Sequence, residues 1–441
     1  MDFSFGMVFN VFKKISTLAH FKHHFMRALT FSFLFLSTGF LTLFAQVKET
    51  LPPDYIRTIQ FTGNTEFSGT PIVELGQPLK LEFDDLVGDE ADYYYKIEHH
   101  NFDWKPSNLA KNEVITGYDN VRIFNYENSF NTLQIFSHYN LKIPNQYVKG
   151  LKVSGNYMIK ILNSDDELVF SRKFIVYEDI VSVQVQTKRS RNVEFINTKQ
   201  VVNFSVDGGK DFLITNPAQN LKTLIVKNNN LQNSIYNLKP QYNIGNKYIY
   251  KYDQKAAFWG GNEYLFFDNK DIRSSTINIQ RIALDEIYHT YLYPDENRFD
   301  NIYTYNPDIN GNFVVRKLRS NQPNIEAEYN WVHFALPNQR DFEGQVYIYG
   351  NFNNYTLDKS TRMKLNTESG YFEGKRLFKQ GFYNYKYVLK KPDGSVNTIF
   401  FSNSFDETEN QYVVLAYYRG VGGRYDRVIG VGSANSRNIT N

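Results

Sequence analysis

The chain has 441 residues, with 33 Tyr, 37 Phe and 3 Trp but no cysteine. This length exceeds one ordinary core, so we expect two to three domains. The lack of cysteine excludes disulfides, thiol catalysis, thiolate metal sites and an N-terminal lipid-modified cysteine, and 49 Lys and Arg against 46 Asp and Glu give a formal net charge of +3.

The N-terminal segment has the pattern of a secretory signal peptide. Four basic residues precede an uncharged apolar run over residues 28–44, and Ala45 then meets Gln46. A basic region, an apolar region and a small final residue are typical of such a signal, and an uncleaved anchor at the short limit of spanning length is the alternative. Removing residues 1–45 leaves 49 − 4 = 45 basic and 46 − 1 = 45 acidic residues. The mature chain is then neutral, which gives no electrostatic case for binding nucleic acid or an anionic membrane, and we expect no direct membrane insertion after signal cleavage.

Beyond this leader, short runs of alternating apolar and polar residues recur between clusters of Asn, Gly, Asp and Pro. No long window has the 3.6-residue period of a helix, and Tyr and Phe suit the half-buried surface of a pleated sheet. The pattern predicts an all-β chain of tandem immunoglobulin-like β-sandwiches.

The turn clusters divide the mature chain into three predicted sandwiches. The first covers residues 50–179 and the second residues 180–282, with strands that include 264–267 and 276–279. The rest of the chain is predicted as an ordered connection over residues 283–324, a third sandwich over residues 325–418 that ends in a strand at 412–418, and a Gly- and Arg-containing C-terminal tail over residues 419–441.

Within the first sandwich, residues 117–145 predict a strand, a turn and a strand. Apolar residues alternate with polar neighbours around Val121 and again around Leu133 and Leu141. The Asn- and Ser-rich piece 125–131 breaks this alternation. We expect it to form a turn that faces solvent or a partner.

Residues with catalytic or metal-binding chemistry do not form a recognisable site. His99 and His100 are adjacent, with Asp103 nearby, but neighbouring side chains on a strand point to opposite faces and cannot bind one ion. Trp104 is expected to be a buried core residue. Residues 308–312 resemble the start of a calcium loop, but the bidentate acid of such a loop is missing, so we expect a plain turn. The P-loop, the nucleophile elbow and the zinc-protease motif are all missing. The sequence predicts no enzyme, metal site or cofactor.

The third predicted sandwich has a more specific pattern. Residues 344–355, 370–374 and 381–388 resemble the glycogen-binding, early-set immunoglobulin-like modules of starch-active enzymes. The resemblance implies that Tyr355 would stack on a sugar face and that Lys386 would contact the sugar. The second platform Trp of those modules is missing, which favours a reused scaffold. A periplasmic glycan-binding protein is therefore the alternative function.

Nearly the whole mature chain is similar to the type IX secretion plug protein family. The motifs that carry the resemblance, in chain order, are HHNFDW at residues 99–104, residues 117–145, SGNY at 154–157, DINGN at 308–312 and DRVIG at 426–430. Ordered motifs in several domains are more specific than any one of them.

The resemblance implies a periplasmic protein at the inner face of the outer membrane of Bacteroidota. Such plugs close the periplasmic mouth of the giant β-barrel translocon of the type IX system, which is the partner that the resemblance implies. In the tail, Arg424, Tyr425, Asp426 and Arg427 are the candidate contact residues, with a disordered terminus as the alternative. We expect no small-molecule ligand, and a structural spacer remains a third possible role.

Overall fold

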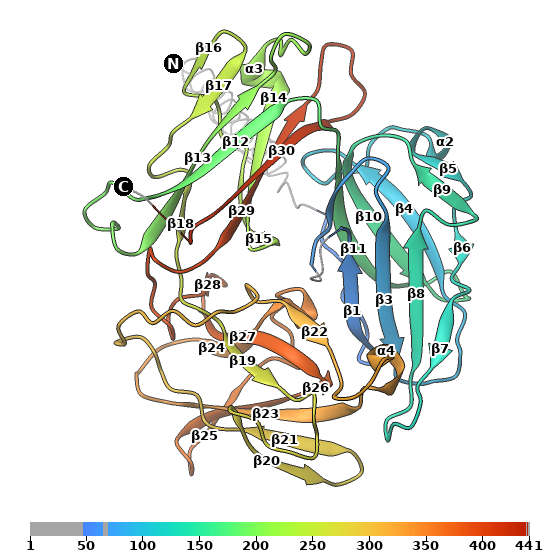
Figure 1. Cartoon of the computed structure of the whole chain (residues 1–441), viewed down its shortest axis with the longest axis vertical. Coiled ribbons are helices and arrows are strands. Elements are labelled where there is room, and N and C mark those ends of the chain that lie inside the picture. Colours follow the sequence, from blue (N-terminus) through green and yellow to red (C-terminus); the bar gives the residue numbers. More distant parts are fainter. Residues whose placement is uncertain (1–46, 65–68, 438, 440–441) are drawn as a thin grey trace, which may run out of the picture. The chain divides into compact units, whose positions relative to one another are not determined.

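The protein is almost entirely β, as the sequence predicts, in a computed structural model that describes residues 47–64, 69–437 and 439 (Figure 1). Residues 49–441 form one compact unit. The predicted signal peptide over residues 1–45 lies outside the described residues. Within those residues, no helix is long and apolar enough to cross a membrane.

The first sandwich packs two sheets over an aromatic core. Phe83 stacks on Tyr139 at 5.0 Å between ring centroids and meets Phe170 edge-on, a packing that aromatic pairs favour. One sheet has the order β1 (Ile56–Thr62), β3 (Leu79–Asp85), β8 (Ser137–Ile143), β7 (Tyr126–Asn128). The other has the order β2 (Ile72–Glu74), β11 (Leu168–Tyr177), β10 (Gly155–Leu162), β4 (Tyr94–His100), β6 (Val121–Arg122), and β5 (Ile115–Gly117) pairs with β9 (Val148–Leu151) beside α2 (Lys111–Val114).

The second sandwich is assembled from two distant parts of the chain. Its core joins Val202 and Phe204 of one sheet to Ile225 and Val414 of the other. One sheet has the order β12 (Ser182–Arg189), β13 (Lys199–Asp207), β17 (Lys247–Tyr250), β16 (Tyr242–Ile244), with β18 (Ala257–Trp259) also on β13. The other has the order β15 (Asn230–Tyr236), β14 (Leu221–Lys227), β29 (Gln411–Tyr418), β30 (Arg427–Asn435), preceded by α3 (Pro217–Asn220).

The third sandwich is inserted between β18 and β29. Phe267, Phe378 and Tyr383 meet in its core. One sheet is built on β27 (Gly381–Lys390), which pairs with β19 (Leu265–Asp268), β22 (Phe313–Val315), β24 (Gln345–Tyr349) and β28 (Val396–Asn397). The other has the order β20 (Ile279–Leu284), β21 (Tyr288–Leu292), β23 (Tyr329–Pro337), β26 (Tyr371–Lys379), β25 (Lys364–Asn366), and short turns α4 (Pro323–Glu326) and η2 (Asn351–Asn353) flank these strands.

This topology corrects the predicted positions of several strands. The strand at 412–418, assigned to the third sandwich, pairs along its length with β14 of the second. The predicted tail contains β30, which pairs with β29. The strands β19 and β20 join the third sandwich rather than the second, and the predicted connection 283–324 contributes β21 and β22 to it. Alternation identifies a strand, but it does not identify the strand's partner.

The segment 117–145 also differs from its prediction. The expected turn at 125–131 contains β7, which pairs with β8. Leu133 and Ile135 lie in no strand, and 50% and 58% of their surfaces are exposed. The real connection between β7 and β8 is therefore the later piece 129–136.

Candidate functional site

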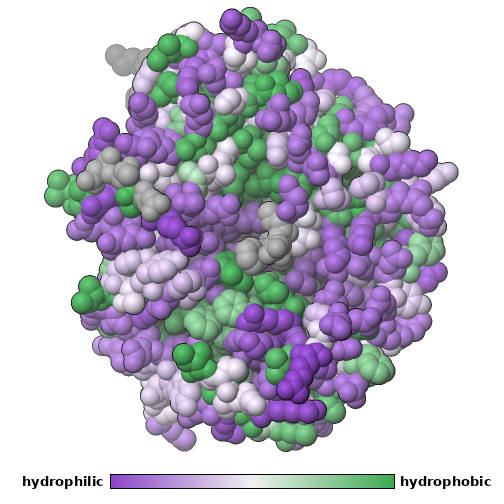
Figure 2. Space-filling model, viewed as in Figure 1, coloured by the Kyte–Doolittle hydropathy of each residue, from purple (hydrophilic) through white to green (hydrophobic). Residues whose placement is uncertain are grey.

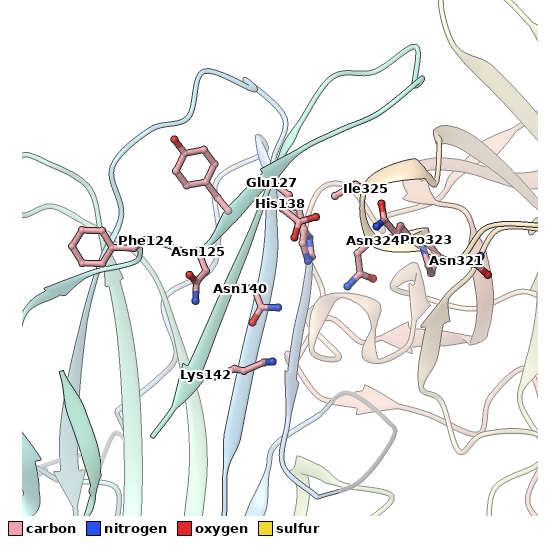
Figure 3. A pocket seen from close by; sticks show the side chains of 12 residues that line it. Phe124, Asn125, Glu127, His138, Asn140, Lys142, Asn321, Pro323, Asn324 and Ile325 are labelled. Atoms are coloured by element: carbon pink, nitrogen blue, oxygen red, sulfur yellow. The ribbon is translucent and has the colours of Figure 1, made fainter. Parts of the chain in front are cut away.

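A cavity of about 570 Å³ lies between β7 and β8 of the first sandwich and the segment that leads into β23 of the third. Figure 3 shows His138, Asn140 and Lys142, alternate residues of β8, on the side that faces this segment. Alternate residues of a strand share one face, so β8 supplies one wall of the cavity. Residues 321–325 form the facing wall.

Below this cavity, a buried group of charges connects the first sandwich to the third. Asp84 of β3 is fully buried, and its Oδ2 accepts hydrogen bonds from Lys379 Nζ at 2.7 Å and from Tyr329 Oη at 2.6 Å. Its Oδ1 lies 2.7 Å from Nδ1 of His138. Lys379 also bonds the carbonyl of Asn324. Replacing Lys379 by a neutral residue would leave the Asp84 carboxylate buried without this cation, which is strongly unfavourable.

The protonation of this group follows from its contacts. Burial alone would raise the pKa of Asp84, but the charges of Lys379 and His138 outweigh burial and lower it. For His138 the balance has the opposite sign, since burial would lower its pKa but hydrogen bonds to Asp84 and Glu82 raise it. Glu82 Oε1 in turn accepts a hydrogen bond from Asn324 Nδ2 at 3.0 Å. At this point the contact between the sandwiches is ionic, beside the aromatic contact of Phe136 with Tyr329 at 5.4 Å between ring centroids.

Beside the cavity, the connection 129–136 presents apolar side chains to solvent. Phe130, Leu133 and Ile135 are 65%, 50% and 58% exposed. Their backbone is nevertheless held, because Phe130 N donates to the carbonyl of Ile325 at 2.9 Å and Leu133 N donates to the Glu328 carboxylate at 2.9 Å. We call residues 129–136 the apolar loop. An ordered loop with exposed large apolar residues is typical of an interaction surface.

Exposed apolar residues elsewhere on the surface can be compared with those of the apolar loop. Figure 2 shows one face of the molecule, on which hydrophobic residues lie in separate groups among hydrophilic ones. Other large exposed apolar residues, such as Leu213, Ile302 and Val421, also occur on the described part of the chain. Single exposed residues of this kind are ordinary on a protein surface. The apolar loop differs from them because it carries three such residues on a backbone fixed by another sandwich.

The predicted contact residues of the tail are engaged inside the chain. Asp426 is 2% exposed and binds Arg419 and Lys222. Arg424 forms an ion pair with Glu113 at 2.7 Å, Arg427 forms one with Glu178 at 2.7 Å, and the Tyr425 ring packs edge-on against His99. These four residues join the loop before β30 to the first sandwich. Their role as a docking segment stays a prediction, and only Arg424 is largely exposed.

The predicted sugar platform does not lie at the surface. Tyr355 is 1% exposed and packs against Tyr349, and Lys386 Nζ lies 4.8 Å from the ring centroid of Tyr264. Burial lowers the pKa of Lys386 to about 8. The prediction that Tyr355 stacks on a sugar is wrong, because a buried ring has no free face.

The histidine pair behaves as strand geometry predicts. His99 Nδ1 lies 2.7 Å from Ser107 Oγ, whereas His100 Nδ1 lies 2.7 Å from the carbonyl oxygen of Trp104. Trp104 is fully buried, which confirms it as a core residue. In the 308–312 segment, Asp308 accepts the backbone N–H of Asn310 at 2.6 Å, as in an ordinary Asx-turn.

The sequence does not reveal the charged group around Asp84. Its charged members come from three strands far apart in the chain, and adjacent acids such as Asp84 and Asp85 are common in solvated turns. The signal that could have found them is the alternation that begins at Leu79, because the strand continues through Asp85. Lys379 ends β26, which also contains two other basic residues, so nothing in the sequence distinguishes it.

Comparison with known proteins adds a family and a solved structure. Residues 56–178 match the family model of the type 9 secretion system plug protein 1st domain. A crystal structure of a hypothetical protein from Parabacteroides merdae is similar over 89% of this chain and 100% of that one, with 30% identity and a TM-score of 0.84. No curated protein matches the chain.

Proposed function

We propose that the chain, whose residues 56–178 match the type 9 secretion system plug protein 1st domain, acts as a plug of that system and binds and seals the periplasmic opening of its giant outer-membrane translocon. The match of the first sandwich to the plug family carries the proposal. A plug of the secretion machinery would act in the periplasm at the outer membrane, and we propose this location for the chain.

The internal contacts of the chain suit a stopper. A pore wide enough for folded cargo leaks unless the object that fills it keeps its shape. The buried pair Asp84–Lys379 joins the first and third sandwiches, and Asp426 joins the loop before β30 to the first sandwich through the N–H of Phe102 at 3.0 Å. Release would require the plug to bind the resting barrel better than the barrel engaged by cargo.

We propose the apolar loop as the main docking element. Partly exposed aromatic and aliphatic side chains on an ordered backbone lose little conformational entropy on binding and supply the anchors that protein interfaces use. The Arg424–Arg427 segment predicted from sequence is a second docking candidate, of which Arg424 has the greatest exposure.

The test is recovery of the partner with the tagged protein from gently solubilised outer membranes. We expect the giant barrel at a one-to-one ratio with the wild-type chain. Replacing Phe130 and Ile135 by Asp should abolish recovery while leaving the fold intact, because both side chains are more than half exposed. The matched control is the double variant Ile302→Asp with Val421→Asp, which adds the same two charges at residues 90% and 95% exposed elsewhere on the chain.

Two outcomes would contradict these proposals. Failure to recover a barrel with the wild-type chain, together with retention on an α-glucan resin, would favour the glycan alternative. Equal recovery with the double variant would show that another surface docks. A gene deletion provides a second check, because loss of a seal should raise outer-membrane permeability only in cells that have the translocon.

A further inference from the structure

A second cavity, with a volume of about 270 Å³, lies where β1 of the first sandwich approaches η2 and the loop 353–360 of the third. It is separate from the apolar loop and plays no part in the proposed sealing. Four cationic side chains and two carboxylates line it: Arg57, Arg172, Lys359, Arg376, Asp54 and Asp358. The excess of positive charge distinguishes this cavity from the one beside β8.

The guanidinium groups at this cavity have few partners within the protein. Arg172 and Arg376 are 7% and 6% exposed. Arg172 Nη1 donates to the carbonyl of its neighbour Ser171 at 2.9 Å, and Arg376 bonds Ser360 Oγ. The buried Nε of Arg57 has no hydrogen-bond partner among the described residues. Arg57 Nη2 also donates to Asp54 Oδ1 at 3.0 Å. Each guanidinium has five N–H donors, and the donors that these contacts do not use, the buried Nε of Arg57 among them, are the groups that would bind an anion.

The nearby carboxylates neutralise these arginines only in part. Asp358 Oδ1 lies 3.8 Å from Arg376 and also accepts hydrogen bonds from the N–H and hydroxyl of Ser360 at 2.7 and 2.6 Å. Asp54 pairs with Arg57 Nη2 at 3.0 Å, but its side chain is 97% exposed, and solvent screens such a pair. Glu49, close to Arg172, accepts a hydrogen bond from the backbone N–H of Lys173 at 2.6 Å. Two carboxylates thus face four cations at the cavity, which leaves an excess of positive charge.

The arginines repel one another as a result. Burial, followed by the charge of Arg57, lowers the pKa of Arg376 to about 10. Burial also lowers the pKa of Arg172. A buried cation without a counter-ion destabilises the folded state. An anion in the cavity would offset this cost.

The shape of the donors indicates the class of anion. The planar guanidinium group of an arginine donates two parallel hydrogen bonds to two oxygens of a phosphate. Leu51, Pro52 and Phe352 also line the cavity and provide an apolar wall beside the charged one. We propose that this cavity binds a phosphate group that carries a small organic part, either a soluble phosphate ester or a lipid headgroup.

The test uses the mature full chain with inorganic phosphate as the first probe, at constant ionic strength set by chloride. Phosphate should raise the thermal midpoint and bind in calorimetry. Arg57→Gln should weaken phosphate binding by about tenfold or more, the loss expected for one charge-assisted hydrogen bond. Without phosphate, the same variant should keep or raise the midpoint, because it removes the repulsion with Arg376. Arg281→Gln, an exposed arginine of β20, is the matched control and should change neither property.

Vesicles identify the source of the phosphate. Binding to phosphatidylglycerol vesicles but not to phosphatidylcholine vesicles, lost in Arg57→Gln, supports a lipid headgroup. A response to free phosphate without vesicle binding supports a soluble ester. Response to neither probe, or an equal response to chloride, overturns the proposal. If Arg57→Gln unfolds the chain, the exposed Lys359→Gln variant replaces it, and unchanged phosphate binding in that variant is then the overturning result.

Discussion

At the scale of single residues, His138 has the most unusual environment that the site contains. It lies on β8 between two buried acids, with Nδ1 2.7 Å from Asp84 and Nε2 3.3 Å from Glu82. Asp84 also pairs with Lys379 of the third sandwich at 2.7 Å. Protonated His138 therefore helps to hold the two carboxylates to which the third sandwich is bound.

We predict that the stability of the protein depends on the charge of His138. Burial lowers the pKa of this histidine, but bonds to Asp84 and Glu82 outweigh it, so its pKa is raised. The stabilisation is thus fully present below the ordinary value of about 6.5 and is lost as pH rises through the raised value. The advantage of wild type over His138→Gln in thermal midpoint should be largest near pH 6 and shrink by about pH 8.5.

The control for this prediction is His333→Gln. Burial lowers the pKa of His333 to about 4, so this histidine is neutral in the folded chain over the same range. The advantage of wild type over His333→Gln should be constant above about pH 7.5 and should fall, not rise, toward pH 6, because only the unfolded state gains this proton there. A constant difference for His138→Gln as well would contradict the assigned role.

At the scale of elements, the sequence identifies strands better than it identifies their neighbours. The alternation at 412–418 correctly indicates β29, but its partner β14 lies almost two hundred residues earlier. In the predicted tail, Gly430 and Gly432 hide β30, because glycine weakens a strand pattern. The glycines have a structural reason, since a Cβ on Gly432 would lie 2.0 Å from the carbonyl oxygen of Val183.

This close contact gives a test of β30 as a core strand. Gly432→Val should push β30 away from β12 and lower the free energy of unfolding by about 1–3 kcal/mol, as overpacking does. The measurement is the midpoint of urea unfolding. Ser433→Val adds the same side chain at the next, exposed position and should change stability by less than about 0.5 kcal/mol. Equal effects of the two variants would mean that β30 is the loose tail predicted from sequence.

A sequence pattern shows a strand but not its distant neighbours, and this decides which parts of the candidate site could be predicted. The segment 117–145 is one of the motifs that carry the family resemblance, and it contains the apolar loop. Its exposed face was assigned to 125–131 instead of 129–136, because Leu133 and Ile135 alternate as strand residues do. Asp84, His138 and Lys379 meet only through the packing of two sandwiches, so no local pattern could bring them together. The arginine cavity is hidden for the same reason.

At the scale of the whole molecule, buried contacts connect all three sandwiches. A cluster that includes Trp104 and Ile175 of the first and Leu415 and Tyr417 of the second is apolar. The second and third meet through a hydrogen bond from Asn230 Nδ2 to Tyr349 Oη at 2.9 Å, which is buried. The contact between the first and third is ionic. These joints are parts of the core, unlike the solvated surfaces that separate flexibly linked domains.

We therefore predict that the mature chain unfolds in one calorimetric transition, with the calorimetric and van't Hoff enthalpies in agreement. Trp104→Ala should destabilise the joint between the first two sandwiches by about 3–5 kcal/mol, because it leaves a large cavity. The transition should then split as the first sandwich melts separately. Trp331→Ala, on the half-exposed face of β23, is the matched control and should keep a single transition. Two or three transitions in the wild-type chain would show independent sandwiches, and such a chain would be a poor seal for a wide pore, since each sandwich could move without the others.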